Sequence, residues 1–309
     1  MIKSQYTQIL IATLSQCLFF LYPLSGSAGL LFVIFYLCPL PLYVIGLMHG
    51  WKIALLIAII SSAIISFSAL SLAQAYALIF ALPSVYFCYL IGLNKKSESE
   101  NEDILWYPLS LVISKILIIS ICLAIIGIFF LGTNISDYQN SINAIYSNIY
   151  EIRPDIQQTI QLNTIELLSA SLPVLFIIFW VLIFVCNLWI SLKFVKILGY
   201  LKRPWSNFDQ INLPKDYIYF LLIFLILSYF SDGIFKIISI SITFAILVGY
   251  SIGGLSIIHN VSKNIRLRPL LLTSIYTLIL VFVPFIIPIT ILGILNYKKN
   301  VRDIIKKRR

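Results

Sequence analysis

The sequence predicts an all-α protein that crosses a membrane several times, and three observations predict this fold class. Apolar residues make up 60% of the 309 positions and charged residues only 11%, too few to cover the surface of a soluble protein of this length. The mean hydropathy is +0.99. Runs of about 20 apolar residues, enough to cross a hydrocarbon core about 30 Å thick, recur along the whole chain. The sequence therefore predicts a polytopic bundle of transmembrane helices.

The gaps between the apolar runs predict the individual helices. We expect a six-helix membrane core in residues 1–200 and additional membrane helices with a basic cytoplasmic tail in residues 201–309. The core helices are expected near residues 7–23, 29–48, 51–67, 69–93, 105–131 and 167–200. About four further membrane helices follow, near residues 216–231, 234–258 and, as a pair, 269–297.

The stretch from Pro269 to Tyr297 is long for one span and short for two, because 29 helical residues extend over about 43 Å. Pro284 and Pro288 lie near its middle, where a helix would break. We favour a helical hairpin of two half-length helices, which places the basic clusters on both sides of the stretch in the cytoplasm. One long kinked helix is the alternative.

The distribution of Lys and Arg predicts the orientation in the membrane. With the amino terminus in the cytoplasm, the turns at 24–28 and 67–70 face outward and contain no Lys or Arg. The turns on the other side carry Lys52, Lys95, Lys96, Lys193, Lys196, Lys202, Arg203 and Lys215. We therefore expect both termini in the cytoplasm. We also expect the first helix to be retained, the alternative being a secretory signal cleaved before Ala28.

The connection over residues 132–166 is expected outside the membrane, with an amphipathic helix in its first half. One helical face of this segment carries Ile135, Tyr138, Ile142, Ile145 and Ile149. Pro154 ends the run. We expect this helix to lie on the outer surface as a lid or as a membrane float.

The motifs of several enzyme classes are absent from the sequence, so we expect no enzyme. No GxxxxGK[ST] motif is present, which excludes ATP hydrolysis by the P-loop route. Two histidines and five scattered cysteines cannot build a multi-histidine or clustered-thiol metal centre. No carboxylate lies at the centre of an expected helix, where proton-coupled transporters place one. We expect no catalytic residue, no cofactor, no bound metal and no nucleic-acid partner.

Polar and helix-breaking residues inside the apolar runs predict a ligand pocket. Lys115 lies about 15 Å into the fifth expected helix, where an ammonium group needs polar neighbours. Pro39 and Pro41 cannot donate to the carbonyl groups of Phe35 and Leu37, a pattern found in the broken helices of transporter substrate sites. The candidate pocket consists of Tyr36, Pro39, Pro41, Tyr86, Lys115 and Asn187. The structural alternatives are a snorkelling lysine and an interhelical hydrogen bond of the asparagine.

Five segments carry a resemblance to a known family. They are CPLPLYVIGLMHGWKIALLIAIISSAI, ALIFALPSVYFCYLIGL, LKRPWSNFDQINLP, GYSIGGLSIIHNVSKN and LGILNYKKNVRDIIKKRR. These segments resemble the YybS-like family of predicted bacterial membrane proteins, domain of unknown function 2232. The chain departs from the expected family pattern at Asn296, where we expect an acidic residue. The resemblance implies a protein of the bacterial inner membrane, in contact with the lipid bilayer.

That family is distantly similar to the S components of energy-coupling-factor transporters, six-helix membrane proteins that bind a vitamin or a metal ion near the outer face. The resemblance implies a solute-binding or transport-related subunit without its own ATPase, which acts with a membrane coupling protein and cytosolic ATPases. Gln16 follows Ala12 where S components often carry a second small residue for the coupling protein. The alternative is a non-transporting scaffold or assembly factor that docks cytosolic partners through residues 201–215 and 298–309.

Overall fold

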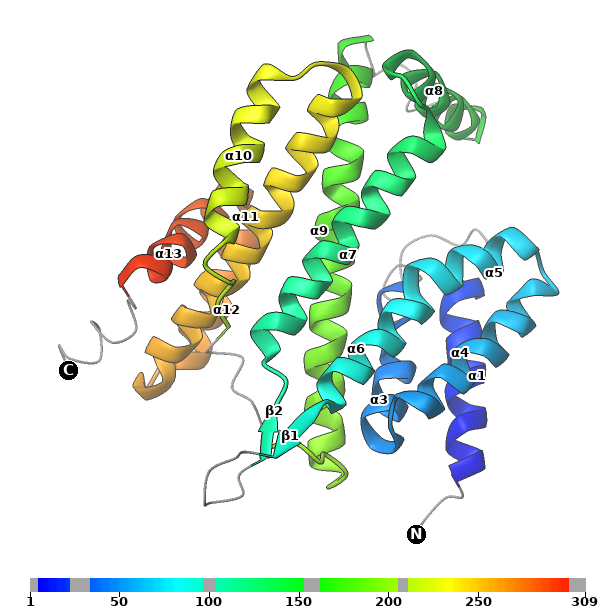
Figure 1. The fold of residues 1–309 in the computed structure, drawn as a ribbon, viewed down its shortest axis with the longest axis vertical. Helices are drawn as coiled ribbons and strands as arrows, with labels where there is room; N and C mark the ends of the chain where they lie inside the picture. The colour runs from blue at the N-terminus through cyan, green and yellow to red at the C-terminus, as the bar shows by residue number, and fades with distance from the viewer. Residues whose placement is uncertain (1–4, 23–33, 97–103, 153–161, 205–210, 300–309) are drawn as a thin grey trace. The chain divides into compact units, whose positions relative to one another are not determined.

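The computed structural model describes residues 5–22, 34–96, 104–152, 162–204 and 211–299. In these residues the regular structure is helical apart from one pair of short strands (Figure 1). The chain divides into unit 1, Met1–Val112 with Val181–Ser206, and unit 2, Ile113–Trp180 with Asn207–Arg309. Two long helices, α7 (Leu109–Leu131) and α9 (Leu162–Ile197), contribute residues to both units. The expected division of the chain at residue 200 separates the six-helix core from the later membrane helices, and it stays a prediction.

Among the described residues, four helices have the length and composition needed to cross a membrane. They are Leu70–Gly92, Leu109–Leu131, Ser171–Ile197 and Gly233–Asn264. Other apolar helices are shorter: α10 (Tyr217–Phe230) has 14 residues, which extend over about 21 Å and fall short of a hydrocarbon core about 30 Å thick. The fold is therefore helical with several candidate spans, whereas the full set of expected spans stays a prediction.

Unit 1 is built on helices that pack against one another. They are α1 (Gln5–Leu21), α3 (Leu40–His49), α4 (Trp51–Ser66) and α6 (Leu82–Gly92). The apolar side chains on their facing sides are buried. Gly46 on α3 lets this helix approach α6 closely, because a Cβ atom at position 46 would collide with the side chain of Cys88.

The helix expected over residues 29–48 is broken at the predicted prolines. Residues 37–39 form a turn that precedes α3. Within this turn the amide of Cys38 donates to the carbonyl of Phe35 at 3.0 Å, and the amide of Leu40 donates to the carbonyl of Leu37 at 2.9 Å. The two carbonyl groups that the prolines were expected to leave free are thus bonded locally. Residues 23–33, which include the alternative cleavage site, lie outside the described residues.

The span expected near 69–93 is not a regular α-helix throughout. It consists of α5 (Leu70–Tyr76), a π-helical turn η2 (Ala77–Ala81) and α6. Pro83 follows the π-turn and cannot donate a backbone hydrogen bond to the preceding turn. A widened turn is one way in which a helix accommodates such a residue.

A pair of short strands precedes the fifth helix and takes the place of its expected start. Strand β1 (Asn94–Lys96) pairs antiparallel with β2 (Ile104–Trp106), and Asn94 lies opposite Trp106. The expected helix start near residue 105 is therefore wrong. Residues 104–106 pair with β1, and α7 begins only after Pro108, whose carbonyl accepts from the amides of the first helical turn.

The amphipathic helix expected in the 132–166 connection is present as α8 (Ile135–Ile152). Asn134 caps its start, because its side-chain oxygen accepts a hydrogen bond of 2.9 Å from the amide of Asp137. On the apolar face, Tyr138 and Ile142 are fully buried in a cluster completed by Ile128 of α7 and by Ile234 and Ile237 of α11 (Gly233–Val261). This part of the face is covered by protein, so the membrane-float interpretation is wrong for it. Pro154 lies outside the described residues.

The break expected near Pro284 is also present. α12 (Arg268–Val281) and α13 (Ile286–Lys299) have 14 residues each and are separated by a 3₁₀ turn, η6 (Val283–Phe285). α13 packs antiparallel along α11, and a hydrogen bond of 2.6 Å joins the hydroxyl groups of Ser251 and Thr290. α13 therefore pairs with α11, and a closely packed α12–α13 hairpin is not what the structure shows.

Candidate ligand-binding site

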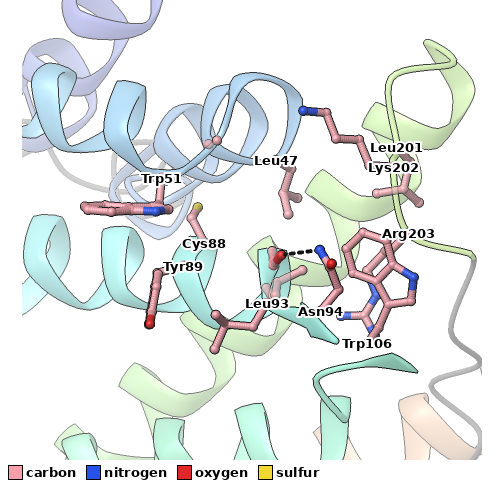
Figure 2. A pocket seen from close by; sticks show the side chains of 14 residues that line it. Leu47, Trp51, Cys88, Tyr89, Leu93, Asn94, Trp106, Leu201, Lys202 and Arg203 are labelled. Atoms are coloured by element: carbon pink, nitrogen blue, oxygen red, sulfur yellow. Dashed lines mark hydrogen bonds between the residues drawn. The ribbon is translucent and has the colours of Figure 1, made fainter. Parts of the chain in front are cut away.

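Unit 1 contains a cavity of about 270 Å³ at the end where α3 meets α4 and α6 meets β1 (Figure 2). We call it the interfacial cavity, because its lining residues belong to the turns that carry Lys52, Lys95, Lys202 and Arg203. These basic turns were expected at the cytoplasmic surface of the membrane. Its lining residues are Gly46, Leu47, Gly50, Trp51, Cys88, Tyr89, Ile91, Gly92, Leu93, Asn94, Trp106, Leu201, Lys202 and Arg203. None of these residues is acidic.

Local backbone structure opens the cavity between α3 and α4. Gly50 has a φ of 99°, a conformation that L side chains rarely adopt, and its amide closes α3 by donating to the carbonyl of Gly46 at 2.9 Å. The chain then starts α4 at Trp51 without a longer loop. On the opposite side, the side-chain amide of Asn94 donates to the carbonyl of Gly92 at 3.2 Å, which holds the end of α6 (Figure 2).

Two aromatic residues form one side of the cavity. The rings of Trp51 and Tyr89 meet edge to face, with centroids 5.6 Å apart. Figure 2 shows them on the side away from Trp106 and Arg203. Both rings are exposed. Tryptophan and tyrosine with an apolar ring and a polar group are typical of the boundary between hydrocarbon and headgroups.

A buried arginine forms the other side. Arg203 is only 7% exposed, its guanidinium donates to the carbonyl of Tyr107 at 3.3 Å, and its Cζ atom lies 5.9 Å from the centre of the Trp106 ring. Burial lowers the pKa of Arg203, yet an arginine stays protonated because its ordinary pKa is so high. Lys202 beside it is exposed. The cavity therefore offers two positive charges. One belongs to the buried Arg203 beside the Trp106 ring, and the other belongs to the exposed Lys202.

The pattern of one family matches the chain over residues 10–296, and that family is described as predicted membrane protein (DUF2232). The chain belongs to the DUF2232 family of predicted membrane proteins. No curated protein and no solved structure matches it.

In this DUF2232 protein, none of the six predicted pocket residues lines the interfacial cavity. Two of them are joined directly: the side-chain amide of Asn187 donates to the carbonyl of Tyr36 at 2.7 Å, and the Tyr36 hydroxyl donates to the carbonyl of Leu182 at 3.0 Å. Pro39 is buried in the turn and Pro41 lies in the first turn of α3. These contacts are structural, and they join the broken helix to α9.

The remaining two predicted residues lie elsewhere. Tyr86 on α6 is 37% exposed and packs on the ring of Phe87. Lys115 is half-buried on α7 and belongs to unit 2, whereas the other five predicted residues belong to unit 1. The freed carbonyl groups that were expected to require a hydrated cavity have protein partners, so they no longer argue for a pocket at Pro39.

The residues of the interfacial cavity were not predicted as a site. Lys202 and Arg203 indicated the orientation of the chain in the membrane. A signal for the cavity exists in the sequence: Trp51 follows the turn glycine Gly50, and Trp106 directly precedes the apolar run. The contact between Arg203 and Trp106 joins segments nearly one hundred residues apart, and the sequence does not show such a contact.

Proposed function

We propose that this protein is a ligand-binding subunit of the bacterial inner membrane, and that its ligand is an anionic amphiphile held in the interfacial cavity. The observation that carries this proposal is the buried Arg203, which lines a cavity with aromatic residues and no acidic residue. An arginine held in place beside aromatic rings suits a ligand that combines an anionic group with an apolar part.

The size of the cavity narrows the ligand class. Its volume of about 270 Å³ lies at the low end for small-molecule sites, which typically measure about 300–1,000 Å³. A headgroup or a compact anion fits this space better than a large solute. Arg203 and Lys202 suit a phosphate, because guanidinium groups bind phosphate oxygens in pairs and lysine adds a point charge. Trp51, Tyr89 and Trp106 suit the apolar part of the same molecule.

The side of the membrane follows from the positive-inside rule. Lys52 and Lys95 adjoin the lining residues Trp51 and Asn94, so this end of unit 1 is placed in the cytoplasm, as are both termini of the chain. The cytoplasmic leaflet carries anionic lipids, and basic pockets between membrane helices on this side bind their headgroups. A lipid headgroup and a soluble organic phosphate share this chemistry, so the test below includes both.

This function is of the solute-binding or transport-related kind that the resemblance to S components implies. The sequence contains no P-loop motif, so any energy from ATP would come from partner ATPases through a membrane coupling protein. In the proposal, the cavity at the cytoplasmic end takes the place of the ligand site near the outer face that the resemblance to S components implies.

The experiment is a binding titration on the purified full-length protein in detergent. Native mass spectrometry would count bound phosphatidylglycerol, with phosphatidylcholine as the neutral-headgroup comparison and glycerol phosphate as the soluble anion. The variants are Arg203→Gln and Lys202→Gln. The matched control is Lys193→Gln, because Lys193 is exposed, lies 5.1 Å from the centre of the Trp189 ring and does not line the cavity.

We expect phosphatidylglycerol to bind more tightly than phosphatidylcholine. Arg203→Gln should weaken that binding about tenfold, which corresponds to about 1.4 kcal/mol. Lys202→Gln changes an exposed side chain and should weaken it less, and Lys193→Gln should leave it unchanged. Binding of glycerol phosphate alone would identify a soluble anion as the ligand. The proposal would be contradicted if all variants bound the two lipids with equal affinity and none of them bound glycerol phosphate.

A second candidate function is the membrane scaffold, and one observation favours it. Leu201, Lys202 and Arg203 belong to the segment that was expected to dock cytosolic partners, and all three line the cavity. In this version an acidic segment of a partner protein occupies the cavity in place of a lipid. Displacement of bound phosphatidylglycerol by an acidic peptide, abolished in Arg203→Gln, would support it.

A further inference from the structure

Helix α12 of unit 2 differs from its neighbours α10, α11 and α13, because none of its 14 described residues is buried. It packs along no other described helix, and the elements that it contacts most are the 3₁₀ turns at its two ends, η5 (Ser262–Asn264) and η6. Fourteen helical residues extend over about 21 Å, too short to cross a hydrocarbon core about 30 Å thick. α12 therefore needs a place in the membrane other than that of a span.

Three contacts keep α12 at the end of α11. At the start of α12, the Arg268 guanidinium donates to the carbonyl of His259 at 3.5 Å. In its middle, the Tyr276 hydroxyl shares a hydrogen bond of 2.8 Å with the Nε2 atom of the same histidine. Beyond its end, Ile289 of α13 lies against Gly254, about 8 Å before His259 along the axis of α11. The start, middle and end of α12 thus stay near the last turns of α11, so α12 crosses the end of this candidate span and does not follow it into the membrane.

The exposed side chains of α12 suit a polar surroundings. Four of them carry a hydroxyl group: Thr273, Ser274, Tyr276 and Thr277. α10 has the same length, but the exposed side chains at its centre are apolar: Leu222, Ile223, Leu225 and Ile226. A polar group that faces hydrocarbon costs free energy, so hydroxyl groups are better placed among lipid headgroups. The exposed faces therefore indicate hydrocarbon around α10 and the membrane boundary around α12.

The start of α12 is also strongly basic. Lys263, Arg266 and Arg268 lie within six positions, and the chain contains no acidic residue between Asp232 and Asp303. Lys263 and Arg266 are exposed. The positive-inside rule places such a cluster in the cytoplasm, where anionic lipids attract basic segments beside membrane helices. The charge of this segment fits anionic headgroups.

We infer that α12 lies in the plane of the cytoplasmic membrane surface, and that Lys263, Arg266 and Arg268 bind anionic lipid headgroups at its start. The leucine and isoleucine side chains of α12 then contact the upper part of the acyl chains, as in other interfacial helices. These residues belong to unit 2, whereas Arg203 belongs to unit 1, so the inference does not depend on the interfacial cavity. The alternative is a re-entrant helix that descends from Arg268 into the hydrocarbon core.

The first test measures depth along α12 in the full-length protein, in nanodiscs of phosphatidylglycerol and phosphatidylcholine. Leu270 and Val281 are both exposed, lie on one side of the helix and are about 16 Å apart along its axis. Leu270→Cys and Val281→Cys, each in a chain without the native cysteines, carry a spin label whose accessibility to oxygen and to a nickel chelate reports depth. The matched control is Leu111→Cys against the native Cys122, two exposed positions with the same spacing on the candidate span α7.

The two labels on α12 should lie at nearly equal depths in the headgroup region, whereas the two labels on α7 should differ in depth by about 16 Å. A difference of that size between Leu270→Cys and Val281→Cys would show a re-entrant helix and overturn the inference. Two labels that are both fully accessible to the nickel chelate, as in water, would overturn it as well.

The second test uses the native cysteines and measures hydrogen exchange of the α12 amides. Exchange should be at least about fivefold slower in nanodiscs with phosphatidylglycerol than in phosphatidylcholine alone, because anionic headgroups hold the basic start of the helix. The double variant Lys263→Gln with Arg266→Gln should lose this difference. Lys236→Gln, an exposed lysine near the opposite end of α11, should keep it, and so should Arg203→Gln. Equal exchange in the two lipids, or a difference that survives in the double variant, would refute the assignment of anionic headgroups to this cluster.

Discussion

The side-chain amide of Asn187 on α9 donates a hydrogen bond of 2.7 Å to the carbonyl of Tyr36, which lies 151 residues earlier in the chain. In an unbroken helix that carbonyl would accept from the amide of Leu40, but Leu40 bonds to Leu37 instead. Asn187 therefore supplies the donor that the break before α3 removes. A helix broken at prolines in an apolar interior needs such a partner.

Replacing Asn187 should destabilise unit 1. Asn187→Leu leaves the Tyr36 carbonyl without its donor, at a cost of about 1–3 kcal/mol. Tyr36→Phe is the control, because the hydroxyl bond to Leu182 that it removes is exposed, and it should change stability by less than about 0.5 kcal/mol. Denaturant unfolding of the detergent-solubilised variants measures both. Equal stability of Asn187→Leu and the wild type would show that the contact has no structural role.

The pairing of α11 with α13 should depend on Gly254. A Cβ atom at this position would collide with the carbonyl oxygen of Ile289, so Gly254→Ala forces the two helices apart. We expect a loss of about 1–3 kcal/mol. The neighbouring Gly253→Ala should be neutral or stabilising by up to about 1 kcal/mol, because its new Cβ makes only an ordinary contact and alanine favours a helix. Thermal unfolding of both variants tests whether Gly254→Ala lowers the stability while Gly253→Ala does not. Equal losses of stability in the two variants would contradict the prediction.

The docking of α8 should depend on its buried face. Ile142→Ala removes a fully buried side chain from the cluster with Ile128 and Ile234, and should cost about 2–4 kcal/mol. Asn143→Ala, one residue away and exposed, should cost less than about 0.5 kcal/mol. Hydrogen exchange of the α8 amides measures the opening of this helix. Unchanged exchange in Ile142→Ala would restore the interpretation of α8 as a membrane float.

Alkaline pH should weaken the same packing through Tyr138. Burial raises the pKa of Tyr138 to about 12, above the ordinary tyrosine value of about 10. Between these two pH values the unfolded chain releases a proton that the folded protein keeps, so stability falls as the pH rises. The difference in phenolate absorbance between the wild type and Tyr138→Phe reports this one group. Its midpoint should lie near 12, and a midpoint near 10 would show that Tyr138 is solvated.

Local sequence signals predicted the features that local chemistry determines. Pro39 and Pro41 predicted the break before α3, and Pro284 predicted the break between α12 and α13, because proline removes a backbone donor wherever it stands. The spacing of Tyr138 and Ile142 predicted α8 and the face that it buries. The partner of that face was not predictable, since nothing in the segment distinguishes lipid from the side chains of α7 and α11.

Features that depend on distant contacts were missed. Trp106 follows two apolar residues and was included in a helix, but strand pairing with Asn94 decides its conformation. The carbonyl groups of Phe35 and Leu37 bond to amides within the turn, and the Tyr36 carbonyl bonds to Asn187 on α9, so the broken helix suggested a pocket that it does not require. Arg203 was one of several loop cations, and only the packed structure shows that it is buried against Trp106.

The measurement that tests the proposed function most directly is an experimental structure of the protein in nanodiscs that contain phosphatidylglycerol. The account predicts density for a phosphate within hydrogen-bonding distance of the Arg203 guanidinium, with the acyl chains leaving past Trp51 and Tyr89. The same density should be lost in Arg203→Gln and kept in Lys193→Gln. A cavity filled by the protein's own side chains, or anionic lipid bound only at other basic residues, would contradict it.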